Sequence, residues 1–199
     1  MKRILRAFGR TVFAAMLVAF GGTEVYAQSQ AQNQTPAQVR SRAEETLEWW
    51  TQIGNKLITM AKDFPEDKYD FKLQKDQRTF AQNLLHVAAI DYYLIGKVSG
   101  KKAGPDFGKG FENPSRAVYK TKADVVKLLE QAVADGAAVI KQQGDAGIDK
   151  TMPFGWETGR HTVRVSYIWL SGIEHSSEHF GQLVVYYRAN NLVPPESRQ

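Results

Sequence analysis

Apolar side chains recur at the three- and four-residue spacing of amphipathic helices in four separate stretches of the chain. These stretches cover residues 36 to about 63, 79 to about 98, 121 to about 143, and about 160 to 190. Thr35 and Pro36 form an N-cap and first-turn pattern before the first stretch, and Gly100 follows the second. No stretch sustains the two-residue alternation of a strand, and we expect only a short extended turn around Met152 to Trp156. The pattern therefore predicts an all-α fold, a four-helix bundle with long connections.

The first 27 residues have the pattern of a secretory signal peptide. Basic residues precede a short apolar stretch over residues 11–22, and a small-residue cleavage signal ends at Ala27. About a dozen apolar residues are too few to span a bilayer, which needs roughly 20. We therefore expect cleavage after Ala27, a flexible Gln-rich segment over residues 28–35 and a bundle domain over residues 36–199. The protein is expected to be exported, periplasmic or secreted, without membrane association after cleavage.

The charge balance and the lack of cysteine limit the chemistry. The formal net charge is +5, but the first 27 residues hold four basic residues and one acidic residue, so 22 basic and 20 acidic groups remain after cleavage. Such a small excess gives no electrostatic case for nucleic acid or an anionic membrane as a partner. Without cysteine, the chain has no disulfide, no cysteine nucleophile and no Cys-ligated zinc, so any metal must be held by His, Asp or Glu.

Two of the four histidines lie four residues apart on the apolar face of the last predicted helix. His175 and His179 share this face with apolar residues before and after them, and two imidazoles at this spacing can reach one metal ion. If the helix already runs through His161, that residue stands about 21 Å along the axis from His175 and cannot share the ion. His86 lies in the middle of the second, strongly apolar helix, where an imidazole needs a partner to offset the cost of burial.

A metal site built from His86, His175 and His179 would give all three buried imidazoles that partner. Three protein ligands leave coordination positions for water or substrate, as in reactive metal sites. In the alternative interpretation, His86 donates a hydrogen bond to a core carbonyl and the pair on the last helix is partly solvated. Glu174 and Glu178 project away from the two histidines and are expected to form a polar flank.

Three further expectations concern residues outside the histidine cluster. The tryptophans of the first and last helices, Trp49, Trp50 and Trp169, are expected in the core. Asp91 is expected at the surface or at a contact between helices. The connection over residues 100–120 is long enough either to do more than link two helices or to be mobile.

Two segments resemble the DinB-like metal-binding four-helix bundle superfamily, which has the DinB/YfiT-like fold. The segment "KYDFKLQKDQRTFAQNLLHVAAIDYYL" resembles the aromatic-containing connection and the following helix with its histidine, and "EHSSEHFGQLVVYYRANNLVPP" resembles the closing signature. The first match implies a ligand role for His86, and the second implies that role for His175 and His179. Phe180 departs from the family pattern, which often has a basic residue there.

The resemblance also implies a function. Members of this superfamily typically bind a divalent metal ion such as nickel or zinc, many form homodimers, and several transfer a small-molecule thiol to an electrophile. We therefore expect an exported divalent-metal-binding protein that acts as a metal-dependent thiol transferase or hydrolase. The alternatives are a non-catalytic stress protein that binds a metal or ligand and a purely structural bundle. Export would place the site away from the reduced thiols that its relatives use.

Overall fold

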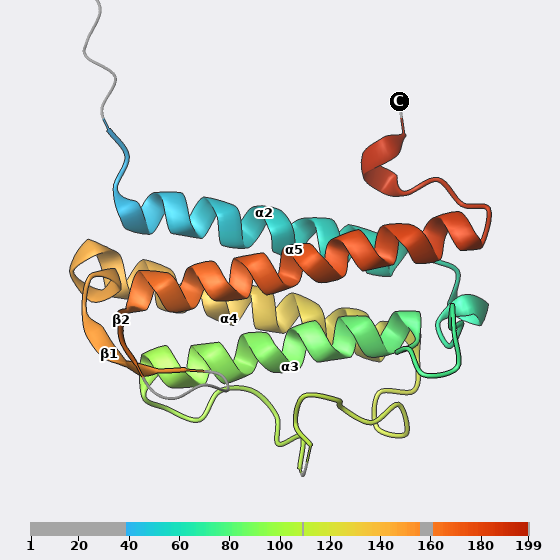
Figure 1. Ribbon diagram of the computed structural model, residues 1–199, viewed down its shortest axis with the longest axis horizontal. Helices are drawn as coiled ribbons and strands as arrows, with labels where there is room; N and C mark the ends of the chain where they lie inside the picture. The colour runs from blue at the N-terminus through green and yellow to red at the C-terminus, as the bar shows by residue number, and fades with distance from the viewer. Residues whose placement is uncertain (1–38, 109, 156–160, 199) are drawn as a thin grey trace, which may run out of the picture. The chain divides into compact units, whose positions relative to one another are not determined.

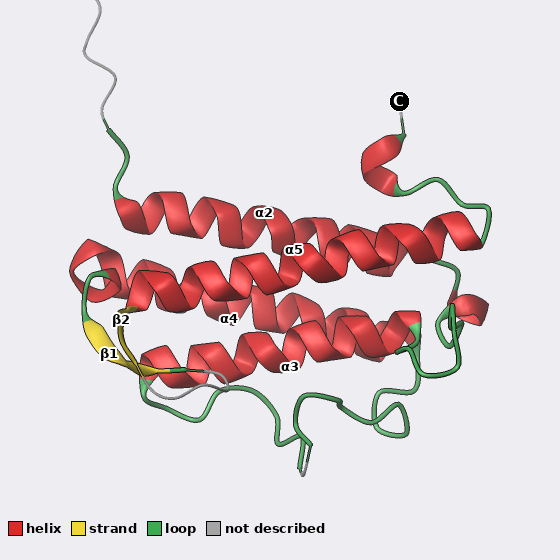
Figure 2. Ribbon diagram, in the orientation of Figure 1, coloured by secondary structure: helices red, strands yellow, loops and turns green. Residues whose placement is uncertain are grey.

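The computed structural model describes residues 39–108, 110–155 and 161–198. Four long helices dominate this part of the chain (Figures 1 and 2), which confirms the all-α prediction. They are α2 (Arg42–Asp63), α3 (Phe80–Ser99), α4 (Lys122–Ile148) and α5 (Val165–Ala189). Two 3-10 turns are added, η1 (Glu66–Lys68) and η2 (Pro195–Ser197). The predicted signal peptide and the Gln-rich segment lie outside the described residues.

Each helix packs against two of the others. Helices α2 and α3 are diagonal to each other, and both lie against α4 and α5. Helices α2 and α5 run in one direction, and α3 and α4 run in the opposite direction (Figure 1). Because α3 and α4 are parallel, the connection over residues 100–121 has to return along the length of α3. It runs beside that helix in Figure 1.

Three of the described helices begin with a capping box. In it, the side-chain oxygen of the N-cap residue accepts a hydrogen bond from the backbone N–H three residues later, and the side chain of that later residue accepts one from the backbone N–H of the N-cap. The N-caps are Ser41, Thr79 and Thr121. Thr79 and Gly100, which has a φ of 68°, bound α3 as the sequence predicted. The predicted cap at Thr35 and Pro36 lies outside the described residues. The described α-helix begins at Arg42, where Ser41 and Glu44 complete a capping box.

A short β-hairpin connects α4 to α5. Helix α4 continues past Gly144, where the chain kinks at a φ of 55° and a ψ of −171°. Strands β1 (Thr151–Phe154) and β2 (His161–Arg164) then pair antiparallel. The extended turn was thus expected in the right place, but His161 lies in a strand, and α5 begins only at Val165.

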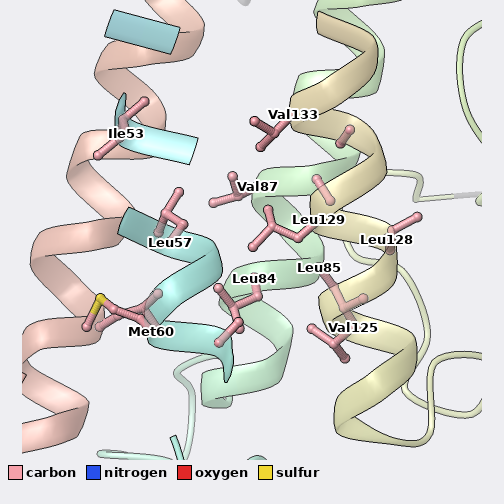
Figure 3. Packing of buried hydrophobic residues seen from close by; sticks show 14 of the residues in the cluster. Ile53, Leu57, Met60, Leu84, Leu85, Val87, Val125, Leu128, Leu129 and Val133 are labelled. Atoms are coloured by element: carbon pink, nitrogen blue, oxygen red, sulfur yellow. The ribbon is translucent and has the colours of Figure 1, made fainter. Parts of the chain in front are cut away.

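Apolar side chains from all four helices fill the core, and Figure 3 shows part of this packing. Trp50 and Trp169 are buried and meet edge to face, with ring centroids 5.2 Å apart, as the sequence predicted for the core. Trp49 was expected there too, but its neighbour on the helix takes the inward position and Trp49 is 60% exposed. Within the described segments, no helix combines the length and apolar character needed to cross a bilayer.

Candidate metal centre

The three predicted histidines meet between two antiparallel helices. His86 lies on α3, and His175 and His179 lie one turn apart on α5. One ring nitrogen of each forms a group in which all the atoms are within 4.8 Å of one another. His86 and His179 are buried, with 6% and 4% of their surface exposed, and His175 is half-buried. The structure therefore brings together the three residues that the sequence selected.

A main-chain carbonyl of the 100–120 connection orients His86. The Nδ1 atom of His86 lies 2.5 Å from the carbonyl oxygen of Glu112. Because a carbonyl oxygen only accepts, Nδ1 carries the proton and the lone pair is left on Nε2. The alternative interpretation expected such a carbonyl bond, and the structure contains one, but this bond turns the free nitrogen of His86 towards the other two histidines.

A side-chain amide orients His179 in the same way. The Nδ2 group of Asn83 donates to the carbonyl oxygen of Thr79 at 3.0 Å, so its Oδ1 atom faces Nδ1 of His179 at 3.1 Å. An amide oxygen only accepts, which places the proton of His179 on Nδ1 and the lone pair on Nε2. Two of the three imidazoles thus present an unprotonated Nε2 atom.

The third imidazole has a different environment. The Nε2 atom of His175 is 3.1 Å from the Nε2 atom of His86, while its Nδ1 atom is buried and has no hydrogen-bond partner. Two imidazole nitrogens at about 2.1 Å from one ion stand roughly 3.0 to 3.4 Å apart for angles of about 90° to 109° at the ion. The separation between His86 and His175 lies within this range, as a metal ion shared by this pair requires.

Burial keeps the cluster neutral. It lowers the pKa of His175 to about 4 and that of His179 to about 3, and it also lowers the pKa of His86. The positive charge of Arg78 lowers all three further, whereas the carbonyl of Glu112 favours the protonated form of His86. At neutral pH the imidazoles are therefore in the form that binds a metal ion.

A cavity of about 690 Å³ lies next to the cluster. Asn83 lines it and also contacts His179, so this one side chain connects the cavity to the cluster, whose three histidines are not among the lining residues. The other lining residues are polar or apolar side chains of the connection before α3, of the 100–120 connection and of α5, namely Leu73, Asp76, Gln77, Arg78, Asn113, Gln182, Val185 and Tyr186. Glu174 and Glu178 are exposed, as expected for a polar flank.

The sequence model of the DinB superfamily matches residues 50–183, a range that contains all three histidines. The chain belongs to the DinB superfamily.

Two crystal structures have the same fold. A DinB-like protein from Bacillus cereus ATCC 10987 aligns with a TM-score of 0.60 and 13% identity, over 76% of this chain and 95% of its own. A conserved protein from Enterococcus faecalis aligns with a TM-score of 0.58 and 12% identity, over 74% of this chain and 95% of its own. No curated protein sequence matches this DinB superfamily chain significantly.

Sequence reasoning missed the groups that hold the imidazoles in this DinB superfamily member. Glu112 acts through its main-chain oxygen, which no side-chain pattern reveals. Asn83 had a detectable signal, because it precedes His86 by three residues and so lies on the same helix face. The 100–120 connection does more than link two helices, in line with one of the two expectations for it.

Proposed function

We propose that this protein binds one divalent metal ion through the Nε2 atoms of His86, His175 and His179. The observation that carries the proposal is the convergence of one ring nitrogen from each of the three histidines, together with the contacts to Glu112 and Asn83 that leave Nε2 of His86 and of His179 unprotonated. Neutral imidazoles suit nickel and zinc, the two ions expected from the family resemblance. In the described part of the chain, no Asp or Glu joins the group.

We further propose a metal-dependent transferase or hydrolase. A divalent ion at such a site acts as a Lewis acid and lowers the pKa of a coordinated thiol or water. The chain's own contribution is to orient the imidazoles through Asn83 and Glu112, to shield them from water, and to admit a small molecule through the adjacent cavity. A thiol cosubstrate would supply the nucleophile that a chain without cysteine lacks.

One feature favours the alternative, a non-catalytic protein that binds a metal or a small ligand. General acid-base catalysis needs a titratable side chain near the reacting group. All three described side chains that meet in the cluster are the proposed ligands themselves. Catalytic proton transfer would therefore depend on the substrate, on water or on a side chain of the cavity such as Asp76, whereas a pure binding protein needs no proton transfer.

Metal analysis tests the proposal. The chain from residue 28, purified without an affinity tag, is expected to contain or take up about one nickel or zinc ion, and His175→Ala is expected to lose it. His161→Ala is the matched control, because His161 is exposed on β2 and outside the cluster, and it should keep the ion. An ion present at 100 times its dissociation constant should stabilise the fold by about 2.7 kcal/mol. A chain that takes up no ion and gains no stability from it would overturn the proposal.

Activity assays separate the two candidate functions. Metal-loaded protein is tested for thiol-dependent consumption of electrophiles and for hydrolysis of activated esters, with the triple histidine variant as control. Turnover that depends on both the metal and the three histidines supports the enzyme. Stoichiometric metal binding without turnover across this panel supports the binding protein.

A further inference from the structure

The cavity beside the histidines contains an arginine that no carboxylate neutralises. Arg78 is half-buried, and no carboxylate oxygen of the described residues lies within 4.0 Å of its side-chain nitrogens. Four other arginines of the described segments are paired with carboxylates, namely Arg40, Arg42, Arg116 and Arg198. The remaining described ones, Arg164 and Arg188, are exposed to solvent. Among the described arginines, Arg78 is therefore the one that is both partly buried and without a carboxylate partner.

Arg78 is held beside the metal centre from two sides. It directly precedes Thr79, the N-cap of α3, and its carbonyl oxygen accepts a hydrogen bond from the hydroxyl of Tyr186 on α5. Its Nε group donates to Oδ1 of Asn113 at 2.9 Å, and Asn113 directly follows the residue whose carbonyl orients His86. These contacts fix the base of the guanidinium and leave its two terminal nitrogens for a ligand.

The rest of the cavity suits a small organic anion. A guanidinium binds a carboxylate through two parallel hydrogen bonds, and this pairing is strongest where water is partly excluded. Gln77 and Gln182 offer further hydrogen bonds, and Leu73 and Val185 line the wall with apolar groups. Asp76 also lines the cavity, but it is exposed and does not pair with Arg78. A volume of about 690 Å³ is within the range of sites for small molecules.

We infer that the cavity binds a carboxylate-bearing small molecule, whose carboxylate pairs with Arg78 while its other end reaches the histidine centre. This inference rests on the proposed metal site and names the substrate or cosubstrate class for it. It gives Arg78 the role of a specificity-determining residue, because a neutral analogue of the same size would leave the guanidinium without a partner in the cavity.

Cobalt-loaded protein provides the test, because a thiolate bound to Co²⁺ changes the visible absorption of the ion. Dissociation constants are measured for ω-mercaptocarboxylates of increasing chain length, from mercaptoacetate to 6-mercaptohexanoate, and for the mercaptoalcohols of matched length. For at least one length, the carboxylate should bind about tenfold or more tightly than the alcohol, as expected for a charge-assisted hydrogen bond. Equal affinities at every length would overturn the inference.

Variants assign the preference to Arg78. Arg78→Gln should abolish the preference for the carboxylate and leave the affinity for the alcohols unchanged, while Arg78→Lys should keep part of the preference. Lys75→Gln is the matched control, because Lys75 is an exposed cation of the same connection that does not line the cavity. If Arg78→Gln does not fold, as judged by circular dichroism, Arg78→Lys decides, and an undiminished preference in Arg78→Lys would overturn the bidentate pairing.

The two proposals fail in different ways. A chain that binds no Co²⁺ contradicts the metal site. A chain that binds one Co²⁺ ion and responds equally to charged and neutral thiols retains the metal site and contradicts the role of Arg78.

Discussion

Replacing Asn83 by leucine should weaken metal binding, although Asn83 is not one of the proposed ligands. The side chain is buried, and its Oδ1 atom accepts the Nδ1 proton of His179. To bind a metal ion through Nε2, His179 must keep its proton on Nδ1. Leucine has a similar branched shape but no polar atoms, so the Asn83→Leu variant removes the acceptor for His179 together with the amide donor to the carbonyl oxygen of Thr79.

The size of the effect follows from the hydrogen bond that is lost. A buried donor without a partner costs about 1 to 3 kcal/mol, which corresponds to about a 5- to 150-fold change in an equilibrium constant. In the metal-free variant the proton of His179 can move to Nε2, so the full cost falls on the metal-bound state. Outer residues that hold metal-binding histidines typically contribute 10- to 100-fold in affinity. We therefore expect the metal dissociation constant to rise by about one to two orders of magnitude.

The assay is a competition titration against a chelator of known affinity, with nickel and with zinc. Asp91→Asn is the control, because Asp91 is a buried polar residue of the same helix and has no hydrogen bond to any of the three histidines. The control should bind metal as the wild type does. A folded Asn83→Leu variant whose dissociation constant stays within about twofold of the wild type would refute the reasoning.

Two further predictions concern stability. Burial raises the pKa of Asp91 well above its ordinary 3.8, and Oδ1 of Asp91 has no hydrogen-bond partner, so above pH 3.8 the folded state holds more protons than the unfolded state. The free energy of unfolding should then fall by about 1.4 kcal/mol per pH unit as the pH rises from 3.8 towards the folded pKa, and urea unfolding of Asp91→Asn at several pH values should lack this slope. In Gly136→Ala the new Cβ atom would lie 2.3 Å from Cζ2 of Trp50, so urea unfolding should show a loss of about 1 to 3 kcal/mol. Gly181→Ala, with open space around its Cβ position, should instead gain up to about 1 kcal/mol, and equal effects at both sites would contradict the packing argument.

The parts of the fold that were predictable from sequence are those that depend on local signals. Helix α3 was placed correctly because its apolar pattern, which starts at residue 79, and its stop at Gly100 lie within the helix or next to it. The hairpin before α5 was not predicted as a pair of strands, because each strand has four residues and neither alternates clearly. Its stability comes from pairing across the turn, for example between Thr151 and Arg164, and such pairing leaves no periodic signal in either segment.

The candidate site also has a part that local sequence signals predict and a part that depends on contacts between distant segments. His86, His175 and His179 could be selected because helical spacing fixes which face each residue occupies, and a buried imidazole needs a partner. The orientation of His86 could not be predicted, because it depends on a main-chain oxygen from a connection that has no helix or strand at Glu112.

The length of the 100–120 connection has a physical explanation in this arrangement. Helix α3 ends far from His86, since Ser99 is 13 positions further along the helix and each step adds about 1.5 Å along the axis. The next helix runs parallel to α3 (Figure 1), so the chain must return along α3, and Glu112 of this connection contacts His86. At that level two consecutive residues face the site, Glu112 with the carbonyl that orients His86 and Asn113 with the oxygen that holds Arg78. An anion paired with Arg78 would therefore lie one residue from the carbonyl that orients His86, so the proposed anion site and the proposed metal site share this segment of the connection.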